Sequence, residues 1–167
     1  MTHTEAVDGN AVTWGRTPGV TPALSLRQPW AWAILHAGKT IENRTAWKGC
    51  AYRGPVWIHA AKGCTRKEYA EAETWMSDRG LPRPDGPFGG FERGGIVGRA
   101  RIVGTVHAPP GRLPLVYGSP FAPARSLTDA ERAWWTGGFA LVLADVEAVP
   151  FTRCRGALGL FTPERTP

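Results

Sequence analysis

Residues 24–44, LSLRQPWAWAILHAGKTIENR, constrain the fold of this chain more than any other stretch. The first four residues alternate between leucine and a polar residue, which predicts a half-buried strand over residues 24–27. Pro29 has no amide hydrogen for a sheet ladder but suits the first position of a helix. The apolar run over residues 30–37 therefore predicts a short buried helix, which Gly38 ends.

A charged strand should follow this helix over residues 39–44. Glu42 and Arg44 are two positions apart on that strand, so they share one face. Because strand, helix and strand follow one another within so few residues, four charged side chains are expected to lie close together: Arg27, Lys39, Glu42 and Arg44. These side chains are compatible with a wet binding cleft, although the residues alone favour an ion-pair cluster at the surface.

The rest of the chain is predicted to contain more strands than helices. Alternating or apolar runs predict strands over residues 56–61, 96–106, 139–149 and 158–161. Two capping boxes, Thr65 with Glu68 and Thr128 with Glu131, predict where two helices start. These helices are too few for alternating βαβ units. We therefore predict a mainly β fold with peripheral helices (α+β), built on a small β-barrel.

The chain length is that of one domain, which we expect over residues 23–165. A flexible N-terminal tail over residues 1–22 is expected to precede it. Two segments rich in Pro and Gly, near residues 81–95 and 108–126, are expected to be irregular insertions. Pro150 is expected to end the strand that begins at residue 139.

Residues 24–44 also resemble the opening signature of the ASCH (activating signal cointegrator homology) domain, a branch of the PUA-like β-barrels. The family pattern of Gly, Lys, Glu and Arg is matched by Gly38, Lys39, Glu42 and Arg44. Three later segments continue the resemblance: YRGPVWIHAA (52–61), GIVG (95–98) and GALGLF (156–161). About four fifths of the chain is covered in the family's order, and the resemblance is greatest to the cointegrator-type branch.

The resemblance implies binding of RNA or single-stranded DNA in a basic cleft built around the motif. Aromatic rings beside basic groups suit nucleic acids, because bases stack on the rings while phosphates meet the charges. The residues expected to bind are Arg27, Gln28, Trp32, Lys39, Thr40, Glu42, Arg44, Trp47, Lys48, Tyr52, Arg53, His59 and Lys62. Trp30 and Trp57 lie in apolar runs and are expected in the core.

A second function class is a small hydrolase that acts on a modified nucleoside (amidohydrolase-like) or on RNA (ribonuclease). Lys39 and Glu42 would be its catalytic residues, because a lysine can act as base or nucleophile when burial lowers its pKa. The amidohydrolase branch has a threonine three positions after the lysine, where this chain has Glu42. A third class, an interaction module for a protein partner, also remains open.

Composition and charge indicate the kind of binding partner and the cellular compartment. The net charge of +6, carried mostly by arginine, suits nucleic acid, although an arginine-rich genome would give the same bias. The three cysteines and the histidines show no zinc-ligand spacing, so neither a metal nor a cofactor is predicted. The sequence shows neither an apolar run long enough to span a membrane nor a secretion signal at the N-terminus. We therefore expect a cytoplasmic protein. The oligomeric state stays open.

Overall fold

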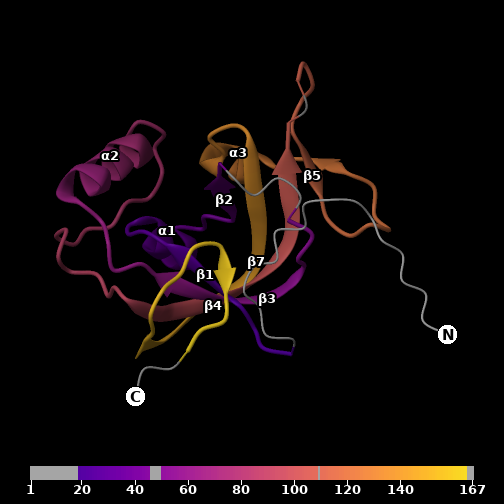
Figure 1. Cartoon of the computed structure of the whole chain (residues 1–167). Coiled ribbons are helices and arrows are strands. Elements are labelled where there is room, and N and C mark those ends of the chain that lie inside the picture. The colour runs from indigo at the N-terminus through magenta and orange to yellow at the C-terminus, as the bar shows by residue number, and fades with distance from the viewer. Residues whose placement is uncertain (1–18, 46–49, 109, 165–167) are drawn as a thin grey trace.

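The structure, a computed structural model, describes residues 19–45, 50–108 and 110–164. Its elements in chain order are β1 (Ala23–Leu26), α1 (Trp30–His36), β2 (Ile41–Arg44), β3 (Gly54–Ala60), α2 (Arg66–Ser77), β4 (Gly95–His107), β5 (Leu115–Tyr117), β6 (Arg125–Ser126), α3 (Asp129–Trp134), β7 (Phe139–Arg153) and β8 (Leu160–Phe161). Figure 1 shows the strands curling around α1, with α2 and the β5–β6 segment at opposite sides. No helix in the described ranges is long and apolar enough to cross a membrane.

The strands form one mixed sheet in the order β2-β7-β4-β3-β1-β8, with β5 and β6 continuing from β4. β1 runs parallel to β3 and antiparallel to β8. The sheet curls into a half-barrel, so the predicted class, mainly β with peripheral helices and a PUA-like barrel, is confirmed. The long antiparallel pair of β4 and β7 forms the middle of the sheet.

Helix α1 lies against the sheet and links the two main parts of the core. Its Ala31 and Ile34 belong to the cluster formed with the sheet, whereas Ala33 packs with residues of α2 and α3. Gly98 of β4 permits this approach, because a Cβ there would lie 2.4 Å from Leu35 Cδ2. The small residues at the start of β4 therefore set how closely the helix packs on the sheet.

Both predicted capping boxes are present. In α2, the Glu68 amide donates to Thr65 Oγ1 and the Thr65 amide donates back to the Glu68 carboxylate. Thr128 and Glu131 make the same reciprocal pair at the start of α3. Each box satisfies amides that a helix N-terminus would otherwise leave without an acceptor.

The structure corrects the predicted strands at Pro150 and in the segment near 108–126. Strand β7 does not end at Pro150 but continues to Arg153. Its register with β4 shifts between Ile96 and Gly98, so the proline lies at an irregularity where no ladder amide is needed. The segment near 108–126 is not wholly irregular, because β5 pairs with both β4 and β6.

Part of the predicted organisation falls outside the described residues. The expected tail over residues 1–22 overlaps them only from residue 19 onward. Trp47 and Lys48, both predicted to bind nucleic acid, lie in the gap between residues 45 and 50 and are not described.

Candidate functional site

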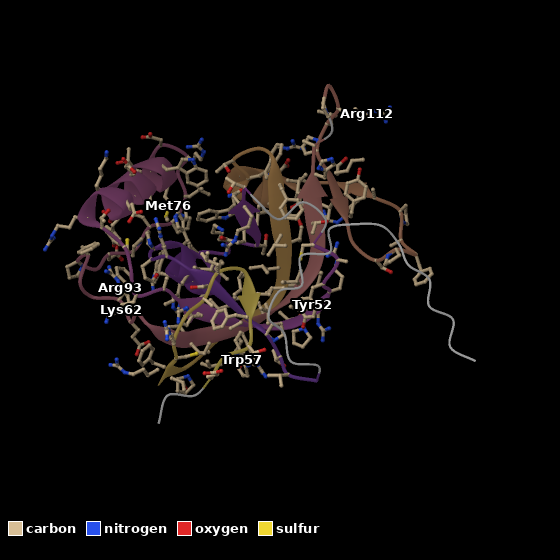
Figure 2. All side chains as sticks on the ribbon, viewed as in Figure 1. Tyr52, Trp57, Lys62, Met76, Arg93 and Arg112 are labelled. Atoms are coloured by element: carbon tan, nitrogen blue, oxygen red, sulfur yellow. The ribbon has the colours of Figure 1, made fainter. Side chains whose placement is uncertain are left out.

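Three adjacent strands bring remote basic residues together at one end of the sheet. The Gly94 amide, just before β4, donates to the Ala60 carbonyl at the end of β3 at 2.7 Å. The Cys154 amide, just after β7, donates to the Gly94 carbonyl at 3.1 Å. The basic side chains that flank these contacts in the sequence are Lys62, Arg93, Arg153 and Arg155. Figure 2 shows Lys62 and Arg93 on the side of the molecule below α2.

These four side chains line a cavity of about 1240 Å³, which we call the basic cavity. Arg27 and Arg44 line it as well, and Glu42 is the one carboxylate among its described lining residues. The remaining wall includes Ser25, His59 and Trp30. A concave surface lined by one sign of charge focuses the electrostatic potential and attracts anions. The cavity is therefore suited to an anionic ligand larger than a simple ion.

Glu42 holds two of the motif's basic side chains. Lys39 Nζ lies 2.6 Å from Glu42 Oε2, and Arg44 Nε lies 3.3 Å from Oε1. Lys39 is only 1% exposed and also donates to the Ile41 carbonyl at 2.5 Å. Burial lowers the pKa of Lys39 below its ordinary value, while the Glu42 carboxylate acts in the opposite direction. The sequence motif thus forms a buried ion-pair network at the wall of the cavity.

Arg44 connects strands that are far apart in the sheet order. Its Nη2 donates to the Ser25 carbonyl of β1 at 2.8 Å, although three other strands separate β1 from β2. The half-barrel is curled far enough for one side chain to reach across its open side. Arg44 therefore stabilises the closure of the sheet while it lines the basic cavity.

His59 forms a polar relay beneath the segment that follows β7. His59 Nε2 lies 3.0 Å from the Cys154 carbonyl, which can only accept, so Nε2 carries the proton. Nδ1 then accepts from the Ser25 hydroxyl, also at 3.0 Å. Burial lowers the pKa of His59, which favours this neutral form. Gly156 lies against the ring, since a Cβ there would be 2.5 Å from His59 Cε1.

A second cavity of about 410 Å³ lies on the α2 side and shares Arg27, Trp30 and Glu42 with the first. We call it the small cavity. Trp30 was expected in the core, but it is only partly buried and lines both cavities. Its ring meets Trp75 of α2 edge to face at 5.6 Å between centroids. Trp30 thus offers an aromatic surface where the two cavities meet.

The structure brings together only part of the predicted site. Six of the predicted residues line at least one of the two cavities: Arg27, Lys39, Glu42, Arg44, His59 and Lys62. Gln28 lines the small cavity but is buried, with its amide donating to the Glu92 carbonyl and its oxygen accepting from the Trp32 amide. Trp32 and Thr40 line neither cavity.

Tyr52 and Arg53 lie at the start of β3, at the opposite end of that strand from Lys62. Arg53 donates to the backbone carbonyls of Cys50, Tyr52, Tyr117 and Gly118 and to the Thr105 hydroxyl. Its guanidinium therefore fastens the start of β3 to β4 and to the end of β5. Neither residue lines the basic cavity.

Arg93, Arg153 and Arg155 line the basic cavity but were not among the residues predicted to bind. Arg93 lies in a predicted insertion, and the other two lie beyond the point where β7 was expected to end. One sequence signal could have indicated these arginines. Arg93 and Arg155 lie next to GIVG and GALGLF, two of the segments that resemble the family. Within the described ranges, no three His, Cys, Asp or Glu side chains are placed to share a metal ion.

The geometry agrees with a comparison against known families. The model of the ASCH domain matches residues 24–112, just over half of the chain, and this range contains the motif, α1 and the strands that form much of the cavity wall. A comparison with curated proteins finds none that matches the chain. The half-barrel and the matched range together show that this chain belongs to the ASCH domain family.

Proposed function

We propose that this protein binds RNA in the basic cavity. The observation that carries the proposal is the convergence of six basic side chains, from five separate segments, on one hollow: Arg27, Arg44, Lys62, Arg93, Arg153 and Arg155. The ASCH domain is generally thought to bind RNA, which agrees with this chemistry. A polyanion that follows the rim can meet several of these groups at once.

The basic groups differ in how free they are to meet phosphate. Arg27 is paired with Glu68 at the rim, and Arg44 is held by Glu42 and Ser25. Lys62, Arg153 and Arg155 are exposed at the surface. We assign phosphate contacts chiefly to this exposed group and a positioning role to Arg44. Arg93 is half-buried, donates to the Phe88 carbonyl at 2.5 Å and lies over the Phe88 ring, so it adds charge to the wall more than a free contact. Trp30 provides a ring on which a base can stack.

A charge-reversal comparison tests the proposal. In Lys62→Glu/Arg155→Glu, two exposed cationic groups of the cavity become anionic. In the matched control Arg112→Glu/Arg132→Glu, the net charge changes equally, but neither residue lines the cavity. Figure 2 shows Arg112 at a projecting tip, away from Lys62 and Arg93.

We expect the cavity variant to weaken binding of a single-stranded RNA by about 10- to 100-fold. The slope of log affinity against log salt concentration should become shallower by about one for each phosphate that the variant no longer neutralises. The control should bind no more than about threefold more weakly, through long-range attraction alone. Equal weakening in both variants would show that binding is diffuse and would overturn the proposal. A DNA strand of the same sequence, titrated in parallel, measures any preference for the ribose hydroxyl.

A second candidate function, hydrolysis of a modified nucleoside, is favoured by one observation. Lys39 is buried with a lowered pKa, which is the state that a catalytic lysine requires. An N-acylated nucleoside incubated with wild type and with Lys39→Met, followed by product analysis, tests this candidate. Turnover by wild type that is lost in the variant would support it, and no turnover by either would eliminate it.

A further inference from the structure

One apolar side chain lies exposed at the rim of the basic cavity. Leu158, in the segment between β7 and β8, is 96% exposed and lines the cavity beside Arg155. The other large apolar side chains that the structure shows as well exposed, such as Leu113 and Phe121, do not line this cavity. A single exposed leucine is ordinary. Its position among cationic groups that face a cavity is what requires an explanation.

The segment that carries Leu158 is anchored from below. The Cys154 carbonyl accepts from His59, and the Cys154 amide donates to Gly94. Gly156 rests on the His59 ring, where a side chain would not fit. Gly159 has φ +76°, a conformation that lets the chain turn back into β8. The buried relay therefore fixes Cys154 and Gly156 at the base of the segment, and Leu158 lies beyond them at the rim.

A ligand that satisfies both features must present phosphates and an apolar face together. Nucleic acid does so when a base leaves its stack, because the neighbouring bases then expose their faces. Proteins use leucine and similar side chains as wedges at such steps. An extrahelical base in turn needs a pocket with an aromatic surface and polar groups. In the basic cavity, these are Trp30 and the wall formed by Ser25, Glu42 and Arg44.

We propose that the ligand is an unpaired nucleotide within an otherwise double-helical RNA. Its base enters the basic cavity beside Trp30, Leu158 fills the gap left between the neighbouring base pairs, and the exposed basic groups meet the flanking phosphates. This inference rests on the proposed RNA binding and specifies the structure of the RNA. In a plain single strand, the neighbouring bases can close over the gap at little cost, so the wedge adds little there.

The test compares three RNAs that share one strand: a duplex with a single-nucleotide bulge, the fully paired duplex and the free strand. Wild type should bind the bulged duplex at least about tenfold more tightly than the paired one, the scale of about 1.4 kcal/mol. Leu158→Ala should lose most of that preference while its affinity for the free strand stays within about twofold. Phe121→Ala, which removes an equally exposed apolar side chain outside the cavity, should behave as wild type.

A fluorescent base analogue placed at the bulge gives an independent readout. Its emission should change when wild type binds and change less with Leu158→Ala. If wild type binds RNA with no preference for the bulge, or if Leu158→Ala keeps the full preference, this inference is overturned while the proposed function stands. If wild type binds none of the three RNAs, the proposed function itself fails.

Discussion

Arg44 Nη2 donates a hydrogen bond to the Ser25 carbonyl at 2.8 Å and so joins β2 to β1 across the open side of the half-barrel. A family motif residue expected to meet phosphate thus has a structural contact of its own. We expect Arg44→Ala to lower the free energy of unfolding by about 1.5–3 kcal/mol, the range for hydrogen bonds of charged groups. Urea denaturation measures this change.

The control for that variant is Arg99→Ala. Arg99 forms its ion pair with Glu147 at the surface, where both side chains are more than half exposed. Such pairs contribute about 0–1 kcal/mol. An equally small loss for Arg44→Ala would show that its hydrogen bond to Ser25 contributes little to closure of the sheet.

Glu42→Gln should destabilise the fold by about 3 kcal/mol, because it leaves the buried Lys39 ammonium opposite a neutral group. The double variant Lys39→Met/Glu42→Gln should recover part of that loss, since no buried charge remains. Glu71→Gln is the control: its pair with Lys67 is exposed, with 3.8 Å between charged atoms. Thermal and urea unfolding of wild type and these three variants measure the changes in stability. An unchanged unfolding midpoint for Glu42→Gln would contradict the prediction.

The same substitution bears on selectivity, because Glu42 lines both cavities. A carboxylate can only accept hydrogen bonds from a base, whereas the amide of glutamine both accepts and donates. Among variant molecules that remain folded at low temperature, we expect the preference among the four RNA homopolymers to change more than the mean affinity. Uniform tightening of all four would mean that Glu42 acts only through its charge.

His59 should make stability depend on pH. Its folded-state pKa is lowered from 6.5, so at pH values between the folded and unfolded pKa the unfolded chain binds the extra proton. The free energy of unfolding should therefore be greatest above pH 6.5. It should fall as the pH decreases through 6.5 toward the folded pKa, by at most about 1.4 kcal/mol per pH unit.

His59→Gln should flatten that part of the stability curve, whereas His36→Gln, at an exposed position, should keep the wild-type shape. Urea titrations across the range of about pH 5 to 8, in which histidine titrates, supply the measurement. A slope that persists without His59 would assign the proton uptake to another group.

Gly98→Ala should destabilise the protein by about 1–3 kcal/mol, the usual cost of an overpacked core. The new methyl group would lie 2.4 Å from Leu35 Cδ2 and 2.9 Å from the Glu147 carbonyl oxygen. Gly63→Ala is the matched control, since nothing lies within 4 Å of a Cβ there. Equal midpoints for the two variants would show that α1 can move away from the sheet without cost.

The sequence correctly predicted those features that depend on residues close together in the chain. The two capping boxes depend on residues three apart, and both were placed correctly from the sequence. The Glu42–Arg44 pairing followed from strand parity in the same way. Lys39 was harder, because it precedes β2 at a turn and its burial depends on how α1 packs.

The rest of the site depends on contacts between remote segments. Arg93, Arg153 and Arg155 reach the basic cavity only because the Gly94 backbone bonds to both Ala60 and Cys154. Nothing in the sequence near those arginines encodes that register. Arg53, in contrast, was expected to bind nucleic acid, but its guanidinium donates hydrogen bonds to backbone carbonyls of a distant segment, at Tyr117 and Gly118.

The place of β1 in the sheet has a consequence for synthesis of the chain. β1 has β3 on one side, and among the described strands only β8, which follows all the others in the chain, covers its other side. Until residues 160–161 leave the ribosome, the nascent chain carries an apolar strand with an open edge, which can pair with other chains. A message truncated before residue 160 would release a product with that edge permanently open. A stall in synthesis before residue 160 would therefore prolong the exposure of that edge to other chains.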